Sequence, residues 1–378
     1  MKQYTLGSVS ISDRAQQYVS QVLDSTLVGP FNFTKRVAEE TAKLHNYTFG
    51  HCLNSGQSAL TIALRAIKKK HNMKHRPLVL TPAITYISTQ ASCYFANCDI
   101  GLVDVNIEDG NMNVDSLIKH LDEYNYKTVI VMPVHLAGKL CDRRIFDICQ
   151  ERDIPTVVDS CEMFAGAKYG VDWGDIICLS SFSNHHVGAG QGGYCVTNDP
   201  ELDLYLFQQI NHGRHDDRKL GSGPGDMANR FRFLDWGESL KFNDLSAALV
   251  LAQIEELDTT LSRYIENARL LSSLLIEDKF ILPKGDNHTY MFYPIIMKNN
   301  KGATDIVKHI NANGIYTRWF MQITNQKVIL DYYNLSQKEI DIAYTNAAYL
   351  NQNAFYVGCH PALSLDDIKE MASIINAA

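Results

Sequence analysis

Five short apolar runs alternate with helix-like segments between residues 57 and 181, and this alternation constrains the fold more than any other feature of the chain. The runs read PLVLT, IGLVDV, TVIVMPV, PTVVD and DIICLSSF. The segments between them, such as 58–70 and 114–124, repeat their apolar residues at helical spacing. Strands that are nearly continuous in apolar residues are typical of a sheet covered on both faces. The pattern predicts an α/β fold with a large, mostly parallel sheet.

The pattern changes near residue 245. A long helical stretch over 244–275 leads away from the predicted sheet, and a strand, a helix and an apolar C-terminal helix follow it. We therefore expect an N-terminal segment and large domain over residues 1–244 and a smaller α/β domain over residues 245–378. Ligands collect beyond the carboxyl ends of strands in such sheets, so Asp159 and Ser181 are candidate site residues.

Composition excludes several classes of protein. Hydrophobic residues make up 46% and charged residues 20%, which excludes a largely disordered chain, and no apolar run approaches the roughly 20 residues of a membrane span. The formal charge of -7 argues against nucleic acid as the main partner. The start of the chain lacks the apolar core of a signal peptide, and no two of the nine cysteines have C-x-x-C spacing. We expect a cytoplasmic protein with reduced thiols and no metal site.

The stretch SSFSNHHVGAGQGG at residues 180–193 permits three interpretations. Its glycines fit G-x-G-x-x-G, but a dinucleotide loop must follow the first strand and open a helix, whereas here a further strand-like run, GGYCVTND, follows. A metal site would need more ligands at suitable spacing. The glycines suit a sharp strand connection, and the two adjacent histidines, which point in different directions on an extended chain, leave room for a catalytic base.

Several motifs stand in an order that resembles the DegT/DnrJ/EryC1/StrS sugar aminotransferase family, a branch of the fold-type I pyridoxal-phosphate enzymes. They run from about residue 10 to the C-terminus and read VGPFNFTKRVAEE, LNSGQSAL, TPAITYISTQAS, PVHLAGKLCD, VVDSCEMFAGAKYG, the histidine stretch and GESLKFNDLSAAL. The resemblance implies an aspartate aminotransferase-like fold with pyridoxal 5'-phosphate or pyridoxamine 5'-phosphate as cofactor.

The resemblance also implies a role for individual residues. A helix that opens after a glycine turn offers N–H groups to the cofactor phosphate, although the same letters fit an ordinary helix cap. An aromatic ring stacks on the pyridine ring, and a carboxylate at a strand end pairs with the ring nitrogen. Glutamate stands where aminotransferases of the family usually carry glutamine. The implied cofactor-binding residues are Gly56, Gln57, Ser58, Tyr86, Asp159, Glu162, Ser181 and Ser239.

The family's Schiff-base lysine lies five residues after a serine, and counting from Ser181 places His186 there. An imidazole cannot anchor the cofactor covalently, but it can move protons near neutral pH. This departure resembles the family's 3-dehydratases of 4-keto-6-deoxy nucleotide sugars, as does the run YVGCHPAL at 356–363. The relatives with an iron–sulfur cluster carry a C-x-C pair, which is absent here, so we expect no cluster.

The implied reaction has two halves. L-glutamate first supplies the amino group to the non-covalently held cofactor. His186 then acts as acid and base while the C3 hydroxyl of the sugar is expelled, with ammonia as a by-product and GDP-4-keto-6-deoxymannose as the expected substrate. Two alternatives stay open: another sugar-modifying reaction or half-reaction on the same cofactor, and a non-catalytic regulatory protein with this fold.

The remaining candidates are assigned by the same resemblance. His185 contacts substrate or orients the loop. A group near the sugar or the phosphate consists of His212, Arg214 and His215, and Arg318 meets a carboxylate of the amino donor or forms a surface salt bridge. Gly237–Glu238–Ser239 replaces a G-Y-N that reaches the partner subunit's phosphate. The resemblance implies a homodimer with its site at the interface and no membrane partner.

Overall fold

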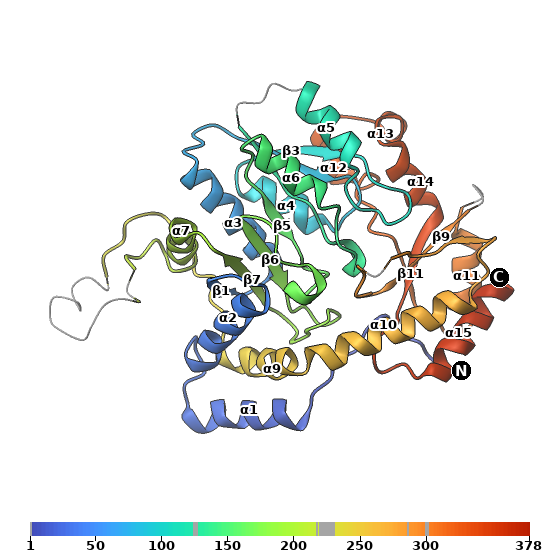
Figure 1. The fold of residues 1–378 in the computed structure, drawn as a ribbon, viewed down its shortest axis with the longest axis horizontal. Coiled ribbons are helices and arrows are strands. Elements are labelled where there is room, and N and C mark those ends of the chain that lie inside the picture. Colours follow the sequence, from blue (N-terminus) through green and yellow to red (C-terminus); the bar gives the residue numbers. More distant parts are fainter. Residues whose placement is uncertain (1, 124–127, 217, 219–230, 286, 299–301) are drawn as a thin grey trace.

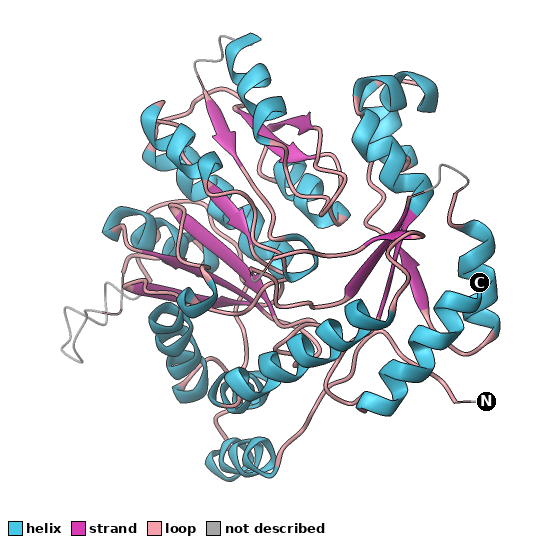
Figure 2. Cartoon of the chain, turned by 45° about the vertical axis from the view of Figure 1, so that its right-hand side comes forward, coloured by secondary structure: helices cyan, strands magenta, loops and turns pink. Residues whose placement is uncertain are grey.

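The computed structural model describes residues 2–378 except 124–127, 217, 219–230, 286 and 299–301. Within these residues the chain forms a large central sheet between helices and a smaller sheet beside the C-terminal helices (Figures 1 and 2). The α/β architecture predicted from the apolar runs is confirmed. No helix of the described part is long and apolar enough to cross a membrane. All nine cysteines are described and are free thiols.

The large sheet joins two ladders of strands, in the orders β1-β7-β6-β5 and β4-β2-β3. Bridges from Val131 to Thr156 and from Val134 to Asp159 connect β4 to β5. Only β7 runs antiparallel to its neighbours in the described ladders, so the carboxyl ends of the other strands meet at one edge. The strands are β1 (Phe49–Leu53), β2 (Leu78–Pro82), β3 (Asp99–Val103), β4 (Val129–Val131), β5 (Val157–Asp159), β6 (Ile176–Ser180) and β7 (Gly193–Thr197).

Helices cover both faces of this sheet (Figure 1). Helix α3 packs on β5, β6 and β7 through an almost continuous set of buried apolar residues, and α2 packs on β1 and β7. The Ser55 hydroxyl caps α3 by accepting the Ser58 N–H at 3.1 Å. The helices are α1 (Asp13–Ser25), α2 (Asn32–Leu44), α3 (Gly56–Lys70), α4 (Ile87–Phe95), α5 (Val114–Glu123), α6 (Arg144–Glu151), α7 (Pro200–Ile210) and α9 (Asp244–Glu255), with short 3-10 turns at Leu136–Gly138 and Ala167–Tyr169.

The C-terminal part builds the smaller, antiparallel sheet in the order β10-β11-β9-β8. Helix α15 begins at a Ser364 capping box and packs on α10, which lies beside α9 in the lower half of Figure 1. Its elements are α10 (Leu257–Leu274), β8 (Phe280–Ile281), β9 (Tyr293–Met297), α11 (Thr304–Ala312), β10 (Thr317–Trp319), α12 (Lys327–Tyr333), α13 (Gln337–Ala343), α14 (Thr345–Asn353), β11 (Ala354–Val357) and α15 (Leu365–Ala377).

The junction between the two parts falls among the helices α9 and α10. Helix α9 packs on α1 and α2 of the large part, whereas α10 packs on α15. The N-terminal segment reaches the small part as well, because Tyr4 pairs with Ile315. We propose that the division lies near residue 256, with the segment before α1 docked on the smaller part.

Candidate active site

Asp159 closes β5 at the edge where the parallel strands end. Its Oδ2 accepts a hydrogen bond from the Thr89 hydroxyl at 2.8 Å, and its Oδ1 accepts one from the Cys161 N–H at 3.1 Å. Burial raises the pKa of this carboxyl, while the two hydrogen bonds oppose the shift. No lysine or arginine of the described part pairs with it. A buried carboxylate of this kind suits a cationic ligand group.

Glu162 lies on the turn after β5, near Asp159. Its Oε2 accepts a hydrogen bond from the Ala137 N–H at 2.6 Å, and Ala137 holds a left-handed backbone with φ of 57°. Burial raises the pKa of Glu162 to about 8, and the neighbouring Asp159 adds to this rise while the Ala137 N–H opposes it. Glu162 therefore carries a proton at neutral pH and can donate a hydrogen bond into the site.

The raised pKa of Glu162 predicts a pH dependence of stability for the cofactor-free protein. The unfolded chain releases this proton near pH 4.5, whereas the folded protein holds it to about pH 8, so the unfolded state binds fewer protons between these values. As the pH rises through this window, the free energy of unfolding should fall more steeply for the wild type than for Glu162→Gln. The difference in slope should be at most about 1.4 kcal/mol per pH unit. Urea denaturation at pH 5 to 8 measures it, and parallel curves for the two proteins would contradict the protonated state.

Three segments meet at the start of α3. A Cβ on Gly56 would lie 2.7 Å from Cys161 Sγ and 2.9 Å from Ser180 Cβ, so only glycine allows this approach. Gln57 accepts a hydrogen bond from the Ser88 hydroxyl at 3.2 Å, which ties α3 to α4. The N-terminus of α3 thus lies against the ends of β5 and β6, and its free N–H groups form a site suited to a phosphate.

The Ser58 hydroxyl is engaged in the helix cap. It donates to Asn54 Oδ1 at 2.7 Å and lies 2.9 Å from the Ser55 hydroxyl. Its backbone N–H is bonded to Ser55 as well. Ser58 therefore shapes the turn, and its hydroxyl is already satisfied by two protein partners.

Two adjacent serines end β6 and begin the next loop, and the structure separates their surroundings. The Ser181 hydroxyl is fully buried, donates to the Gln191 carbonyl at 2.8 Å and lies 2.8 Å from the Tyr194 hydroxyl. Ser180 instead lies against Gly56 at the start of α3. The geometry favours Ser180 for the phosphate contact that the sequence assigns to Ser181.

If the count starts from Ser180 instead of Ser181, the position five residues later is His185 instead of His186. The His185 ring is half-buried, and its Nδ1 lies 3.3 Å from the Ser180 carbonyl. A carbonyl only accepts, so Nδ1 carries the proton and Nε2 bears the lone pair. Burial lowers the pKa of His185 to about 4, although the bond to Ser180 opposes this shift. The ring is therefore neutral at physiological pH, and its Nε2 has no hydrogen-bond partner among the described residues.

His186 points into the protein. Its ring packs edge-on against Tyr264 of α10 at 5.0 Å, and its Nε2 lies 3.2 Å from the Thr289 carbonyl. Its Nδ1 is buried and has no hydrogen-bond partner among the described residues. Burial lowers the pKa of His186 to about 3. The geometry is that of an anchor between the loop and the smaller part of the chain.

Two tyrosines and an arginine face the site from α4 and the smaller sheet. Tyr86 precedes α4 and is 60% exposed, so its ring is available for stacking. Tyr356 of β11 stacks on Phe292 at 3.9 Å, and burial raises the pKa of its hydroxyl, with nearby Glu162 adding to the rise. Arg318 of β10 lies opposite Tyr356, is exposed and has no acidic partner in the described part. These side chains border the space next to Glu162.

The other predicted residues belong to the segment that follows α7. His212 donates its N–H to the Glu238 carbonyl at 3.0 Å, and the His215 N–H donates to the Arg232 carbonyl at 2.7 Å. Arg214 lies over the Phe231 ring. Ser239 is exposed and pairs with Asn211. The described contacts do not bring this group together with Asp159 or the α3 N-terminus within one chain.

Glu238 is held by Arg65 of α3 in a salt bridge. Its carboxylate is thus partly neutralised, which reduces the repulsion that an acid at this position would exert on a nearby phosphate.

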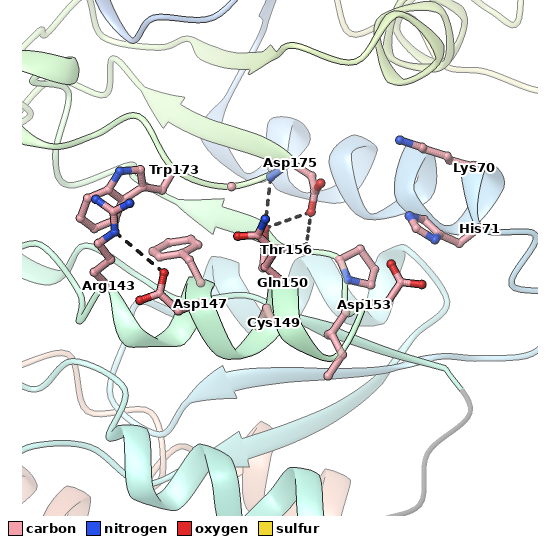
Figure 3. A pocket seen from close by; sticks show the side chains of 14 residues that line it. Lys70, His71, Arg143, Asp147, Cys149, Gln150, Asp153, Thr156, Trp173 and Asp175 are labelled. Atoms are coloured by element: carbon pink, nitrogen blue, oxygen red, sulfur yellow. Dashed lines mark hydrogen bonds and ion pairs between the residues drawn. The ribbon is translucent and has the colours of Figure 1, made fainter.

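A separate hollow of about 490 Å³ lies at the opposite edge of the sheet, before β5 and β6 (Figure 3). Several of its charged groups have partners: Arg143 stacks on Trp173 at 4.3 Å and faces Asp147, and Asp175 accepts hydrogen bonds from Thr156. Lys70, also on its wall, pairs with Asp199. Several of the charged side chains of the hollow therefore already have protein partners.

A large sheet with one antiparallel strand, a buried acid at a strand end and a helix N-terminus beside it define the fold of the pyridoxal-phosphate-dependent aminotransferases. The chain belongs to the DegT/DnrJ/EryC1/StrS aminotransferase family, whose model matches residues 9–376. A curated GDP-perosamine synthase of Escherichia coli O157:H7 is 26% identical over 331 residues, 84% of each chain.

Two further relatives carry the same activity in their names. The GDP-4-keto-6-deoxy-D-mannose 3-dehydratase of Escherichia coli O55:H7 is 24% identical over 394 residues, 99% of this chain and 100% of the relative. A solved structure of an E. coli GDP-4-keto-6-deoxy-D-mannose 3-dehydratase with bound hydrated PLP has a TM-score of 0.87 at 22% identity, covering 99% of this chain and 100% of that one. Relatives named as a synthase and as dehydratases therefore share this fold and most of this length.

Proposed function

We propose that this protein is a 3-dehydratase of 4-keto-6-deoxy nucleotide sugars that uses pyridoxal phosphate and pyridoxamine phosphate. GDP-4-keto-6-deoxymannose is the substrate we expect, and L-glutamate is the amino donor. The observation that carries the proposal is the neutral imidazole of His185 at the position five residues after the serine that lies against α3. Its Nε2 has no hydrogen-bond partner in the part of the chain that the structure describes. An imidazole there supports proton transfer without covalent attachment of the cofactor.

The residues present fit such a cofactor. Asp159 is a buried carboxylate that accepts two hydrogen bonds but has no cationic partner in the described residues, which suits a protonated ring nitrogen. The N-terminus of α3 at Gly56 and Gln57, with Ser180 beside it, would hold the phosphate. Tyr86 has a free face for stacking, and the protonated Glu162 would donate a hydrogen bond to an oxygen on the ring.

When bound, the cofactor supplies an amine that condenses with a ketone and a ring that stores electrons. The chain's own contribution is proton transfer and orientation. The bond from Nδ1–H to the Ser180 carbonyl holds the His185 ring in one tautomer, so that Nε2 takes up a proton. The same Nε2–H can then deliver this proton to the departing C3 hydroxyl, so one ring serves both steps. Arg318, with its planar guanidinium, would bind a carboxylate of glutamate.

The identity of the product tests this proposal. Incubation with pyridoxal phosphate, L-glutamate and GDP-4-keto-6-deoxymannose should yield 2-oxoglutarate, ammonia and a sugar nucleotide that has lost the C3 oxygen, as read by mass spectrometry. An amino sugar in place of free ammonia would show a transaminase instead. Failure of glutamate to convert the cofactor to its amine form would remove the first half of the mechanism.

We further propose a homodimer that forms through the segment after α7. Residues 231–236 expose several large apolar side chains, and this segment lies on the α7 side of the molecule (Figure 1). Large exposed apolar side chains gathered on one short segment are typical of a protein interface. The exposed large apolar residues of the segment are Phe231, Phe233, Leu234 and Trp236.

A charge in this cluster should weaken the dimer. Trp236, which is 92% exposed in the single chain, would be buried at the interface, so Trp236→Asp should raise the dissociation constant by at least about tenfold, as expected for loss of an aromatic interface residue. Ile342→Asp, at an apolar site on α13 that is 67% exposed, is the matched control and should leave assembly unchanged. Analytical ultracentrifugation measures both, and an unaltered dimer in Trp236→Asp would show that the interface lies elsewhere.

A further inference from the structure

We propose that residues 5–8, here called the strap, fix the position of the histidine loop, residues 181–192, and that His360 and Gly7 are positioning residues for His185. The expected effect on kcat rests on the proposed function, whereas the contact between the strap and the histidine loop does not. The strap is the extended segment that leads from the smaller part of the chain towards α1. It explains the run YVGCHPAL, to which the reaction itself assigns no role.

His360 holds the strap with both ring nitrogens. Its Nε2 lies 3.1 Å from the carbonyl and 3.1 Å from the hydroxyl of Thr5, and its Nδ1 lies 3.2 Å from the Ser8 hydroxyl. A carbonyl only accepts, so Nε2 carries the proton and Nδ1 accepts the Ser8 O–H. The ring is 2% exposed, and burial lowers its pKa, which favours this neutral form. One side chain thus bonds two strap residues three positions apart.

The surface under the strap is closely packed. A Cβ on Gly358 would lie 2.1 Å from the Thr5 carbonyl oxygen, so the strap rests directly on the backbone there. The Asn267 amide lies within 3.2 Å of the carbonyls of Cys359, His360 and Leu363, which fixes the turn that carries the imidazole. The strap is therefore anchored to α10 and the C-terminal turn rather than to its own neighbours.

The far end of the strap meets the histidine loop. A Cβ on Gly7 would lie 3.1 Å from Asn184 Cβ and 3.3 Å from Asn184 Cα, so the two backbones are in close contact. Asn184 immediately precedes His185. Other bonds hold the loop from its second half, where His186 reaches Thr289 and both backbone groups of Gly188 bond to the Gln253 amide. The strap supplies the support on the side of Asn184.

A shift of the strap would move Asn184 and therefore the neighbouring acid–base residue His185. The His185 ring is held by the bond of Nδ1 to the Ser180 carbonyl and by an edge-on contact with the Phe182 ring at 6.0 Å. Its backbone N–H donates to the Phe182 carbonyl, and the short backbone path from Asn184 also sets the direction of Nε2. Displacements near 1 Å in a catalytic group cost about 100-fold in rate. A looser strap should therefore lower kcat, while groups that bind the sugar stay in place and KM changes little.

Three variants test the coupling. His360→Ala should release the strap, and His360→Gln should retain it, because the glutamine amide can donate to the Thr5 carbonyl from the place of Nε2. His309→Ala, on the exposed side of α11, is the matched control. In residues 181–189 the His185 and Ala189 amides are hydrogen-bonded within the loop. Hydrogen exchange followed by mass spectrometry should show faster exchange of this segment in His360→Ala and in neither of the other two variants.

The kinetic arm should show a tenfold or larger loss of kcat in His360→Ala with KM nearly unchanged. His360→Gln should recover most of this loss. Gly7→Val gives an independent check, since it crowds Asn184 without touching His360 and should lower kcat in the same way. The proposal would be overturned if His360→Ala showed faster hydrogen exchange in the strap, unchanged exchange in the histidine loop and an unchanged kcat. An inactive wild type would instead refute the proposed function, and the exchange data would still decide the coupling.

Discussion

The His185→Asn variant should lose dehydration activity by roughly 10²–10⁴-fold, the range that a general acid–base side chain contributes. Asparagine is close in size to the imidazole and can keep a hydrogen bond to the Ser180 carbonyl, 3.3 Å from Nδ1 in the wild type, but it cannot take up and return a proton. Cofactor binding and the KM for the sugar should stay near their wild-type values. Steady-state release of ammonia measures the effect.

The same substitution one residue later is the matched control. His186 is buried against Tyr264 and bonded to Thr289, so His186→Asn should lower the free energy of unfolding by about 1–3 kcal/mol and retain most of the activity. The reverse pattern, with His186→Asn inactive and His185→Asn active, would return the acid–base role to His186. Equal losses in both variants would indicate that the loop acts only as a structural unit.

The second large effect is expected at Asp159. Asp159→Asn is nearly isosteric but removes the negative charge that faces a cationic ring nitrogen, and loss of such a preorganised electrostatic partner costs roughly 10²–10³-fold in kcat. The cofactor-free variant should be as stable as the wild type or more stable, because the buried charge itself is unfavourable to folding. Activity and thermal unfolding together separate this outcome from simple misfolding.

Asp175 provides the control for Asp159. It precedes β6 at the opposite edge of the same sheet, and its carboxylate accepts the N–H and hydroxyl of Thr156. Asp175→Asn should affect stability and leave the kcat of the folded enzyme unchanged. If both aspartate variants lost activity in proportion to their stability, Asp159 would have only a structural role.

Much of this site could be predicted from local sequence. Nearly continuous apolar runs identify buried strands, and a polar residue that closes such a run, as Asp159 does, lies at the edge where ligands bind. The start of helix α3 at Gly56 is marked in the sequence by the capping residue Ser55, whose hydroxyl accepts the Ser58 N–H. These features depend on neighbours along the chain, which is why the sequence contains them.

Which of the two histidines takes the position of the lysine could not be predicted in this way. Two serines stand together at the end of β6, and counting from either is equally consistent with the letters. Only the packing distinguishes them: Tyr194 and Gln191 occupy the Ser181 hydroxyl, and Gly56 lies against Ser180. A shift of one residue reverses which histidine faces the site, because adjacent side chains point in different directions.

Contacts between distant segments were equally beyond local reasoning. Tyr356 and the contact of Gly7 with Asn184 carry no pattern of their own in the sequence, because each depends on how the smaller part docks on the large sheet. The exposed apolar residues of 231–236 gain a meaning only once the structure shows them uncovered.

Covalent capture of the cofactor tests most directly whether His185 occupies the place of the Schiff-base lysine. Wild type, His185→Lys and His186→Lys are each incubated with pyridoxal phosphate, reduced with borohydride and weighed intact by mass spectrometry, with tryptic mapping of any adduct. We expect the mass of one reduced cofactor on His185→Lys, mapped to that position, and none at residue 185 or 186 in the other two proteins. An adduct on His186→Lys with none on His185→Lys would contradict the account.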